Sequence, residues 1–289
     1  MIQKIDRVND DVRLFQLRPV EGENIKVATY SIPVPKSSSL TGFQFLPGQW
    51  LDVYVPGIPK AGGFTITSPP RLLSTRTPYL ELAIQKSPSN PPAAWLWQPE
   101  SSILESELQV RVGGSFFWPS KLARSAERRI RRAVFVAGGV GINPLISMVS
   151  TLEHVKKESG ELGFSVKFLY TTRDPGSSRS PTEILFLERL QSIFRTLGTE
   201  GELHLFLTPS KNTAEGPSTD AVGFNDKSLS VQRRRITQKD LIDTLGPVEE
   251  RPETVCYICG VPEMTDEFVE KARRAEGIGE ENVLFEKWW

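Results

Sequence analysis

The stretch 133-AVFVAGGVGINPLISMV-149 decides how the second half of this chain is read. An apolar, β-branched run meets a glycine cluster and an apolar helical pattern follows, which outlines a nucleotide-binding turn. The dinucleotide pattern G-x-G-x-x-G fails, because Pro144 stands where the third glycine belongs after Gly139 and Gly141. A P-loop is excluded too, since no Lys-Ser or Lys-Thr pair follows the glycines.

The chemistry of this turn suits an anionic ligand. Asn143 is a good N-cap residue, and Pro144 suits the first helical position, where a missing N–H costs nothing. Gly138, Gly139 and Gly141 allow the backbone to approach a ligand, and the exposed amides with the helix dipole favour a diphosphate. A plain tight turn between strand and helix is the alternative. The helix is expected to bury Leu145, Met148, Val149, Leu152 and Val155.

The rest of the second half alternates strand and helix patterns. Strands are expected at 133–137, 164–171, 203–208, 254–259 and 282–286, and helices at 143–157, 181–195, 237–245 and 262–276. Such alternation predicts a parallel α/β sheet of the Rossmann type. The polar stretch 209–235 interrupts it and is interpreted as a surface insertion.

The first half has a different character. Short runs at 27–32, 50–55, 63–68, 79–85 and 107–112 are divided by Pro, Gly and Ser clusters, which indicates a small antiparallel barrel or sandwich. The boundaries predicted are a β-barrel domain at 1–118, a linker at 119–132 and an α/β domain at 133–289. The arginines of the linker are either solvated or form a basic docking patch for an acidic electron-transfer partner.

Composition excludes several partners. The 289 residues carry 35 basic and 35 acidic side chains, so net charge gives no case for nucleic acid or for a membrane surface. No apolar run approaches the roughly 20 residues of a membrane span. The first 15 residues are typical of mature protein, so the expected location is the cytoplasm, or mitochondria if a transit peptide is missing from the chain.

The only cysteines, Cys256 and Cys259, invite a redox or zinc interpretation. Both lie in an expected strand, where positions three apart point to opposite faces, so the thiols should not meet. A zinc site would need further ligands, and the chain has two histidines, His154 and His204. We therefore expect neither a metal site nor a dithiol, and two cysteines are too few for an iron–sulfur cluster.

Four motifs occur in one order along the chain: GFTITS at 63–68, GGVGINP at 138–144, CGVP at 259–262 and FEKWW at 285–289. Together with GQW at 48–50 and RVGGSFF at 111–117, they resemble the ferredoxin–NADP reductase superfamily. Within it, the chain is most similar to the oxidoreductase NAD-binding domain-containing proteins. The resemblance covers nearly the whole chain and implies a flavin-binding barrel followed by a pyridine-nucleotide domain.

The resemblance implies flavin-binding residues in the first domain. The family motif Arg-x-Tyr-Ser/Thr falls on Gly62 to Thr65, so Phe64 would stack on the isoalloxazine ring, beside Ile66, and Thr65 would reach flavin N5. Gly62 replaces the arginine that binds the flavin phosphate, and Lys86 or Arg71 would have to substitute. The stretch with Gly113, Gly114 and Ser115 would lie near the phosphate or adenosine portion of FAD; a hairpin end with a bulge explains it equally.

In the second domain, the resemblance assigns residues to the pyridine nucleotide. The pyrophosphate would contact Gly138, Gly139, Val140, Gly141 and Pro144. Cys259, with Gly260, would lie against the nicotinamide, whereas a small buried strand residue is the alternative for the cysteine. Trp288 would cover the flavin face, with Glu286 as a nearby polar group. Alternatively, the two tryptophans at the end of the chain close the core.

The expected function is a FAD-dependent NAD(P)H oxidoreductase that passes electrons to a separate acceptor, a small molecule or a redox protein. Two rivals are a catalytically silent nucleotide-binding or interaction module that has lost its flavin, which Gly62 favours, and a dehydrogenase without flavin. Arg173 could pair with a 2′-phosphate, whereas Asp174 would repel it. NADH is preferred slightly, because no second basic residue follows until Arg179.

Overall fold

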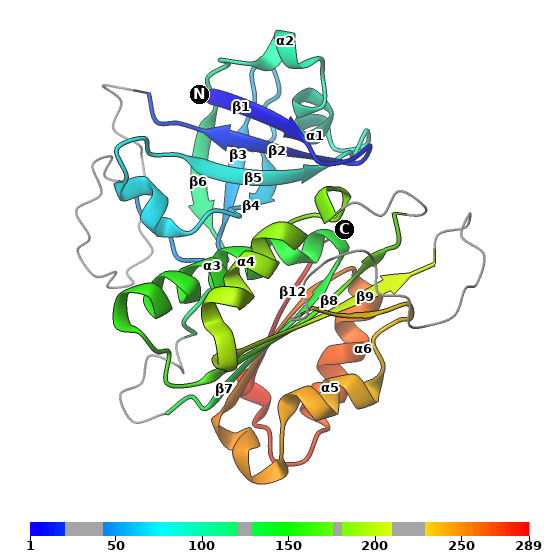
Figure 1. The fold of residues 1–289 in the computed structure, drawn as a ribbon. Coiled ribbons are helices and arrows are strands. Elements are labelled where there is room, and N and C mark those ends of the chain that lie inside the picture. The colour runs from blue at the N-terminus through cyan, green and yellow to red at the C-terminus, as the bar shows by residue number, and fades with distance from the viewer. Residues whose placement is uncertain (21–42, 121–128, 176–180, 210–228, 289) are drawn as a thin grey trace. The chain divides into compact units, whose positions relative to one another are not determined.

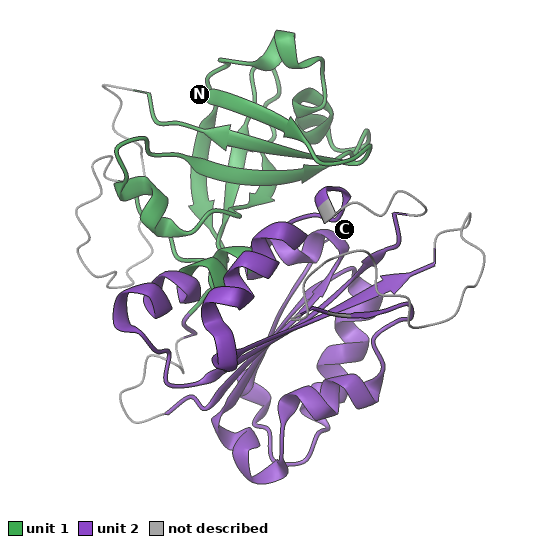
Figure 2. Ribbon diagram, in the orientation of Figure 1, with its two compact units in different colours: residues 1–118, 146–151 green, residues 119–145, 152–289 purple. Residues whose placement is uncertain are grey.

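The computed structural model describes residues 1–20, 43–120, 129–175, 181–209 and 229–288. The chain forms two compact units, which Figure 2 distinguishes by colour. Unit 1 comprises Met1–Trp118 and Ile146–Thr151, and unit 2 comprises Pro119–Leu145 and Leu152–Trp289. The strand expected at 27–32 lies outside the described residues, as does most of the linker and of the insertion.

Unit 1 contains two three-stranded antiparallel sheets. One has the order β1-β2-β5, from Ile2–Arg7, Val12–Leu17 and Leu80–Gln85, and the other has the order β4-β3-β6, from Gly62–Thr65, Trp50–Tyr54 and Gln109–Gly113. A single bridge between Ile66 and Leu82 joins them. A shared apolar core, which includes Phe15, Leu51 and Ile66, fills this small barrel. The unit also has a 3-10 helix at Pro70–Ser74, α1 at Pro91–Leu96 and α2 at Glu100–Ile103.

Strands β1 and β2 were not predicted. Ile2 is the only fully buried residue of β1, whose other side chains are polar or only partly buried, so the alternation that announces a strand is weak. Pairing with β2, and through β2 with β5, forms the strand instead. Tertiary pairing therefore overrides a weak local pattern.

Unit 2 contains a six-stranded parallel sheet with the order β10-β9-β8-β7-β11-β12. In chain order the strands are β7 (Arg132–Gly138), β8 (Ser165–Arg173), β9 (Gly201–Thr208), β10 (Leu229–Gln232), β11 (Thr254–Gly260) and β12 (Val283–Lys287). Figure 1 shows helices α3 (Ile142–Ser159) and α4 (Leu187–Leu197) on one face, and α5 (Gln238–Leu245) and α6 (Pro262–Arg273) on the other. The expected Rossmann-like parallel α/β sheet is confirmed.

Three local expectations for unit 2 were wrong. The helix expected at 181–195 is a 3-10 turn at Pro181–Glu183 followed by α4, because Phe186 adopts a left-handed φ of 60° that breaks the helix. Part of the supposed surface insertion is strand β10, which pairs with β9. Val155, expected in the core, is 42% exposed.

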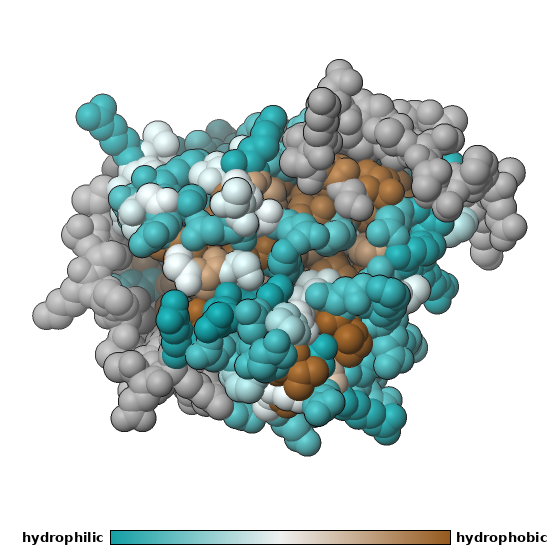
Figure 3. Space-filling view, turned by 60° about the horizontal axis from the view of Figure 1, so that its bottom comes forward, coloured by the Kyte–Doolittle hydropathy of each residue, from teal (hydrophilic) through white to brown (hydrophobic). Residues whose placement is uncertain are grey.

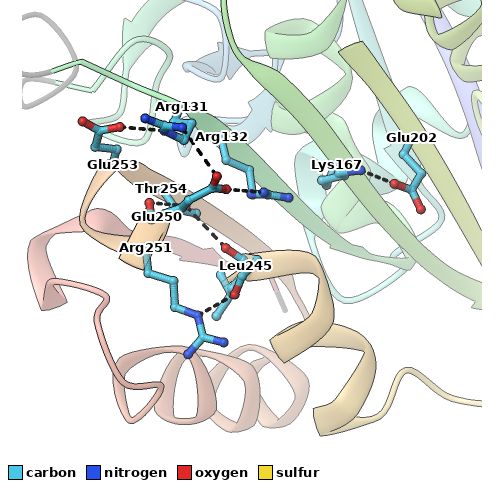
Figure 4. A network of polar contacts seen from close by, with 10 residues as sticks. Arg131, Arg132, Lys167, Glu202, Leu245, Glu250, Arg251, Glu253 and Thr254 are labelled. Carbon is cyan, nitrogen blue, oxygen red and sulfur yellow. Dashed lines mark hydrogen bonds and ion pairs between the residues drawn. The ribbon is translucent and has the colours of Figure 1, made fainter. Parts of the chain in front are cut away.

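A polar network fixes the amino-terminal edge of this sheet (Figure 4). Arg132 Nη2 lies 2.8 Å from Glu250 Oε2, and Arg131 Nε lies 2.9 Å from Glu253 Oε2. The buried Arg251 donates to the backbone oxygens of Gly246 and Glu276, just beyond the ends of α5 and α6. Arg131 and Arg132 of the linker are thus paired with carboxylates and give the docking-patch interpretation no support, whereas Arg129, the third linker arginine that the structure describes, is exposed.

The described surface is mainly hydrophilic. Figure 3 shows one face on which apolar groups form separate patches among polar side chains. Large exposed apolar residues, such as Val20, Leu104 and Phe285, lie far apart in the sequence. Within the described ranges, no helix combines the length and hydropathy needed to cross a bilayer.

Candidate functional site

The glycine turn after β7 begins α3 one residue earlier than expected. Gly139–Gly141 form a 3-10 turn, Gly141 caps the helix, and the first helical residue is Ile142. Asn143 is therefore not the N-cap. The 3-10 turn at Gly139–Gly141 leads directly into α3, so the helix begins one residue before Asn143. Pro144 still falls in the first helical turn, where its missing N–H breaks no helical hydrogen bond.

The three glycines of this turn serve different purposes. A Cβ on Gly141 would lie 2.3 Å from the carbonyl oxygen of Cys259, so this glycine is required for backbone packing. A Cβ on Gly138 would lie 2.3 Å from Met264 Sδ, at the start of α6. Gly139 has a φ of +54° and no atom within 4 Å of its Cβ position. Gly139 is thus the position where the backbone is open to a ligand, with the half-buried Val140 next to it.

The turn lies at the topological switch point of the sheet. The strands β8 and β9 extend from one side of β7, and β11 and β12 extend from the other side. Open α/β sheets bind ligands outside the carboxyl ends of the strands at such a point. Cys259 pairs in register with Ala137 of β7, which brings Cys259 and Gly260 to the same edge as the glycine turn.

Cys259 and Glu286 are neighbours across β11 and β12. Cys259 is fully buried, and burial, assisted by the charge of Glu286, raises the pKa of its thiol well above the ordinary range. Burial also raises the pKa of Glu286 to about 7, against the opposing effect of a hydrogen bond from Trp288. A thiol that stays protonated does not act as a nucleophile, so Cys259 is a small, unreactive, buried residue of β11.

Trp288 is held at the same edge by two hydrogen bonds. Its indole Nε1 donates to Glu286 Oε2 at 3.1 Å, and its backbone N donates to Gly260 O at 3.1 Å. The structure therefore brings together four of the predicted residues: Cys259, Gly260, Glu286 and Trp288. Trp289, the second aromatic residue of FEKWW, lies outside the described residues.

The carboxyl end of β8 carries the residues predicted to distinguish the two nucleotides. Arg173 is exposed, whereas Asp174 is buried and lies 3.9 Å from Arg233 Nε. Arg233 follows β10 directly, so the strand that was not predicted supplies a second basic residue at this edge. Asp174 thus faces a cation rather than solvent, and Arg179 lies outside the described residues.

In unit 1, the predicted flavin residues divide between the two faces of the β4-β3-β6 sheet. Thr65, Trp50 and Gly113 form one row in register across the sheet. Phe64 faces the opposite side, in the core, because neighbouring strand residues alternate between faces. Ile66 is fully buried, so its side chain is a core residue, and Ser115 is exposed.

Phe64 closes the position where the family motif has an arginine. A Cβ on Gly62 would lie 2.6 Å from the Phe64 ring and 2.9 Å from Pro92 Cβ, so no larger side chain fits without displacing them. Lys86 does not replace the missing cation at this point. It lies 5.6 Å from the Trp97 ring, which also contacts Arg13, at the opposite end of α1 from Pro92.

The Trp50 indole leaves no room for a side chain at Gly113 or Gly114. A Cβ on either residue would lie 2.7 Å from the Trp50 indole, and Gly114 also has a φ of +99°. The Gln49 side chain donates to Gly114 O at 3.0 Å and fixes the segment from the other side. The glycines expected to approach a cofactor phosphate are therefore covered by an aromatic ring of the same unit.

These residues fit one half of a FAD molecule better than the other. Thr65 is 3% exposed, and its hydroxyl makes no hydrogen bond to another described residue, so it is the candidate contact to a flavin ring. The adenine nucleotide half finds neither an arginine at position 62 nor an open surface at Gly113 and Gly114. Thr65 thus fits the ring, whereas the residues assigned to the phosphate do not fit that group.

Metal chemistry gains no support from the described residues. No group of three or more His, Cys, Asp or Glu side chains gathers there in a way that could hold a metal ion. Cys256 and Cys259 are both free and buried, and Cys256 belongs to the core that α5 and α6 cover.

Sequence reasoning missed three residues at these places: Trp50, Met264 and Arg233. Trp50 belonged to the GQW motif without a role of its own, and Met264 was one residue of the helix expected at 262–276. Their positions against glycines depend on neighbouring strands and cannot be derived from local pattern. Arg233 lies in a run of three arginines, 233-RRR-235, and that run was the available signal.

Known proteins resemble this chain over nearly its whole length, although no protein-family model matches it. It is 32% identical over 297 residues to oxidoreductase NAD-binding domain-containing protein 1 of Homo sapiens, covering 99% of this chain and 86% of the relative. Two solved structures share the fold, each with a TM-score of 0.64. They are the flavohem-like FAD/NAD binding domain of a Vibrio cholerae nitric oxide dioxygenase (13% identity, 99% and 96% coverage) and ferredoxin-NADP+ reductase from Plasmodium falciparum (15% identity, 99% and 94% coverage). The fold is therefore that of the ferredoxin–NADP reductases.

Proposed function

The chain belongs to the family of oxidoreductase NAD-binding domain-containing protein 1, and on that premise we propose that it is a flavin-dependent NAD(P)H oxidoreductase. In this proposal, hydride passes from the nicotinamide to a flavin, with FAD as the first candidate, and electrons pass on to a separate acceptor. The names and titles of the similar proteins support an oxidoreductase with a pyridine nucleotide and a flavin.

One observation carries the proposal: the open backbone at Gly139 lies at the switch point of a parallel sheet, where Cys259, Glu286 and Trp288 also meet. The backbone at Gly139 is open just before the start of α3, and the dipole of that helix favours a diphosphate there. The fold class alone would not suffice, because one fold supports many functions.

Each residue would act by binding or by controlling access. Gly139 and Val140 would let the pyrophosphate approach, while Gly138 and Gly141 hold the turn on β11. Cys259, which is small, protonated and buried, would leave room for the nicotinamide beside it. Trp288, bonded to Glu286, would cover that place until the nucleotide displaces it. In the other unit, Thr65 would donate its hydroxyl to the flavin ring, and the bound flavin would supply the hydride acceptor.

A second candidate is a nucleotide-binding module that has lost its flavin. Gly62 favours it, because the Phe64 ring excludes the family's arginine from that position. A dehydrogenase without flavin would explain the glycine turn but gives no role to Thr65 in unit 1.

The choice between NADH and NADPH belongs to the same proposal. Two observations oppose the slight preference for NADH: Asp174 faces Arg233, and Arg173 is exposed beside them. An arginine that pairs with a 2′-phosphate contributes roughly 1.5–3 kcal/mol, about tenfold to a hundredfold in affinity. Steady-state kinetics of the wild type and of Arg173→Ala with both nucleotides test it. If NADPH has the higher kcat/KM and the mutation removes that advantage, the NADH preference is wrong.

The experiment that tests the function is an anaerobic visible spectrum. The purified protein is incubated with FAD, freed of excess flavin, and mixed with NADH or NADPH. Bleaching of the bound flavin supports the oxidoreductase. A protein that binds the nucleotide but leaves a bound flavin oxidised contradicts it, and Gly139→Ala serves as the control with impaired nucleotide binding.

The acceptor is a separate small molecule or redox protein in this proposal, with the cytoplasm as the location. The two buried free cysteines agree with a reducing compartment, and cell fractionation tests the location.

A further inference from the structure

The β4-β3-β6 sheet of unit 1 presents a face on which an indole lies between two predicted cofactor contacts. Trp50 is in register with Thr65 on one side and with Gly113 on the other. Its six-membered ring covers Gly113, its pyrrole edge covers Gly114, and its Cε3 lies 3.9 Å from the Cβ position of Gly63. A fused bicyclic ring thus lies flat on a floor of three glycines.

An indole and an adenine have the same fused arrangement of a five-membered and a six-membered ring. Glycine floors allow such a ring to stack, because no Cβ projects from them. At Gly113 and Gly114, where the resemblance implies the phosphate or adenosine portion of the cofactor, the chain already provides its own ring. Adenine and indole cannot occupy this floor together, since a Cβ there would already lie within 3.0 Å of the indole.

Position 62, where the family motif has its arginine, offers the diphosphate no cation. The Phe64 ring and Pro92 close position 62 against a larger side chain. Arg111, two residues before Gly113, donates through Nε to Asp52 Oδ2 at 2.8 Å, so its charge is balanced. This observation is independent of Trp50, and it concerns the same half of the cofactor.

We infer that this chain recognises the flavin ring without using the adenine nucleotide half. Riboflavin, FMN and FAD are therefore ligands of about equal affinity, and the bound flavin exchanges with free flavin. This inference rests on the proposed function, because it describes the flavin that the same site would take. Thr65 supplies the contact common to all three ligands. Trp50 covers Gly113 and Gly114, so the adenine of FAD cannot stack on them.

The test is a fluorescence titration of the flavin-free full-length chain with riboflavin, FMN and FAD. For the wild type we expect three dissociation constants within about threefold of one another. Trp50→Ala uncovers Gly113 and Gly114, and it should tighten FAD binding about tenfold relative to riboflavin, as stacking on a free surface would. Trp97→Ala is the matched control, since this half-buried indole of the same unit lies away from the glycine floor and should leave the ratios unchanged.

Two outcomes would overturn the inference, and they differ in what they say of the proposed function. If wild-type protein binds FAD more than tenfold tighter than riboflavin, the indole yields to adenine and the flavin function stands. If none of the three flavins binds to the wild type or to Trp50→Ala, the inference and the flavin function fail together. The wild-type ratio needs no variant, so a Trp50→Ala protein that fails to fold leaves the inference testable.

Discussion

Substituting the glycines after β7 by alanine, one at a time, separates ligand approach from packing. Gly139 and Gly141 are two residues apart in one turn, yet only Gly141 contacts another strand. Gly139→Ala places a methyl group where no atom lies within 4 Å, at the cost of a left-handed φ of +54°. Gly141→Ala places it 2.3 Å from the Cys259 carbonyl oxygen, well inside the 3.4 Å at which ordinary contact begins.

The two costs can be estimated separately. An alanine in the left-handed region destabilises by about 1 kcal/mol, which lowers Tm by about 2–4 °C in a unit of this size. Backbone that cannot move aside makes the second change an overpacking, with a cost of about 1–3 kcal/mol or more. For dinucleotide binding, a methyl group at Gly139 would remove at least one charge-assisted amide contact, so we expect Kd to rise roughly tenfold to a hundredfold.

Thermal unfolding followed by circular dichroism gives the stabilities, and calorimetric titration with NADH and NADPH gives the affinities. Gly139→Ala should remain nearly as stable as the wild type but bind poorly, and Gly141→Ala should show the larger loss of Tm. The reasoning is refuted if Gly139→Ala binds both nucleotides with the wild-type Kd. Equal losses of Tm in the two variants would refute the packing argument.

Two further changes probe the charges of unit 2. Because burial raises the pKa of Glu286 from 4.5 to about 7, the folded state favours the protonated carboxyl, and wild-type stability should fall as pH rises through this window. Glu286→Gln should remove that fall and be more stable than the wild type above pH 7 by roughly 1–3 kcal/mol, and parallel pH profiles of Tm would contradict this. Glu250→Gln weakens the pairs with Arg131 and Arg132 and should lower Tm by about 2–4 °C for a loss of about 1 kcal/mol. Nucleotide Kd should not change, because the carboxyl edge lies about 20 Å away along β7, and a changed Kd would show that the amino edge influences the candidate site.

The sequence was sufficient for the alternation of elements in unit 2. Buried parallel strands are continuous apolar runs and amphipathic helices have a 3.6-residue period, so 133–137 and 254–259 could be assigned from composition alone. The same reasoning failed at β10, where LSVQ is too short and too polar to differ from a loop. Pairing with β9 supplies the missing stabilisation.

The parts of the candidate site that depend on the order of strands, turns and helices along the chain could be predicted. The parts that depend on which residues of neighbouring strands are paired could not. Gly139 could be identified because a glycine cluster between a strand and a helix is typical of a phosphate-binding turn. The position of Trp50 depends on which residues of β4 and β6 stand beside it, and a shift of one residue would turn its ring to the other face. Asp174 was expected to repel a 2′-phosphate, and its pairing with Arg233 could not be foreseen because the two residues are distant in the chain.

The order of the strands in unit 2 determines at which stage of folding the chain gains its affinity for a dinucleotide. The strands β7, β8 and β9 are successive in the chain and adjacent in the sheet, so they can associate early through short loop closures. β11 must then dock against β7, and the pair of Arg131 with Glu253, which marks this docking, joins residues 122 apart. Contacts of such separation form late and slowly. The contact between the Cys259 backbone and the glycine turn should therefore form near the end of folding. A refolding chain would then regain most of its secondary structure before it regains affinity for a dinucleotide.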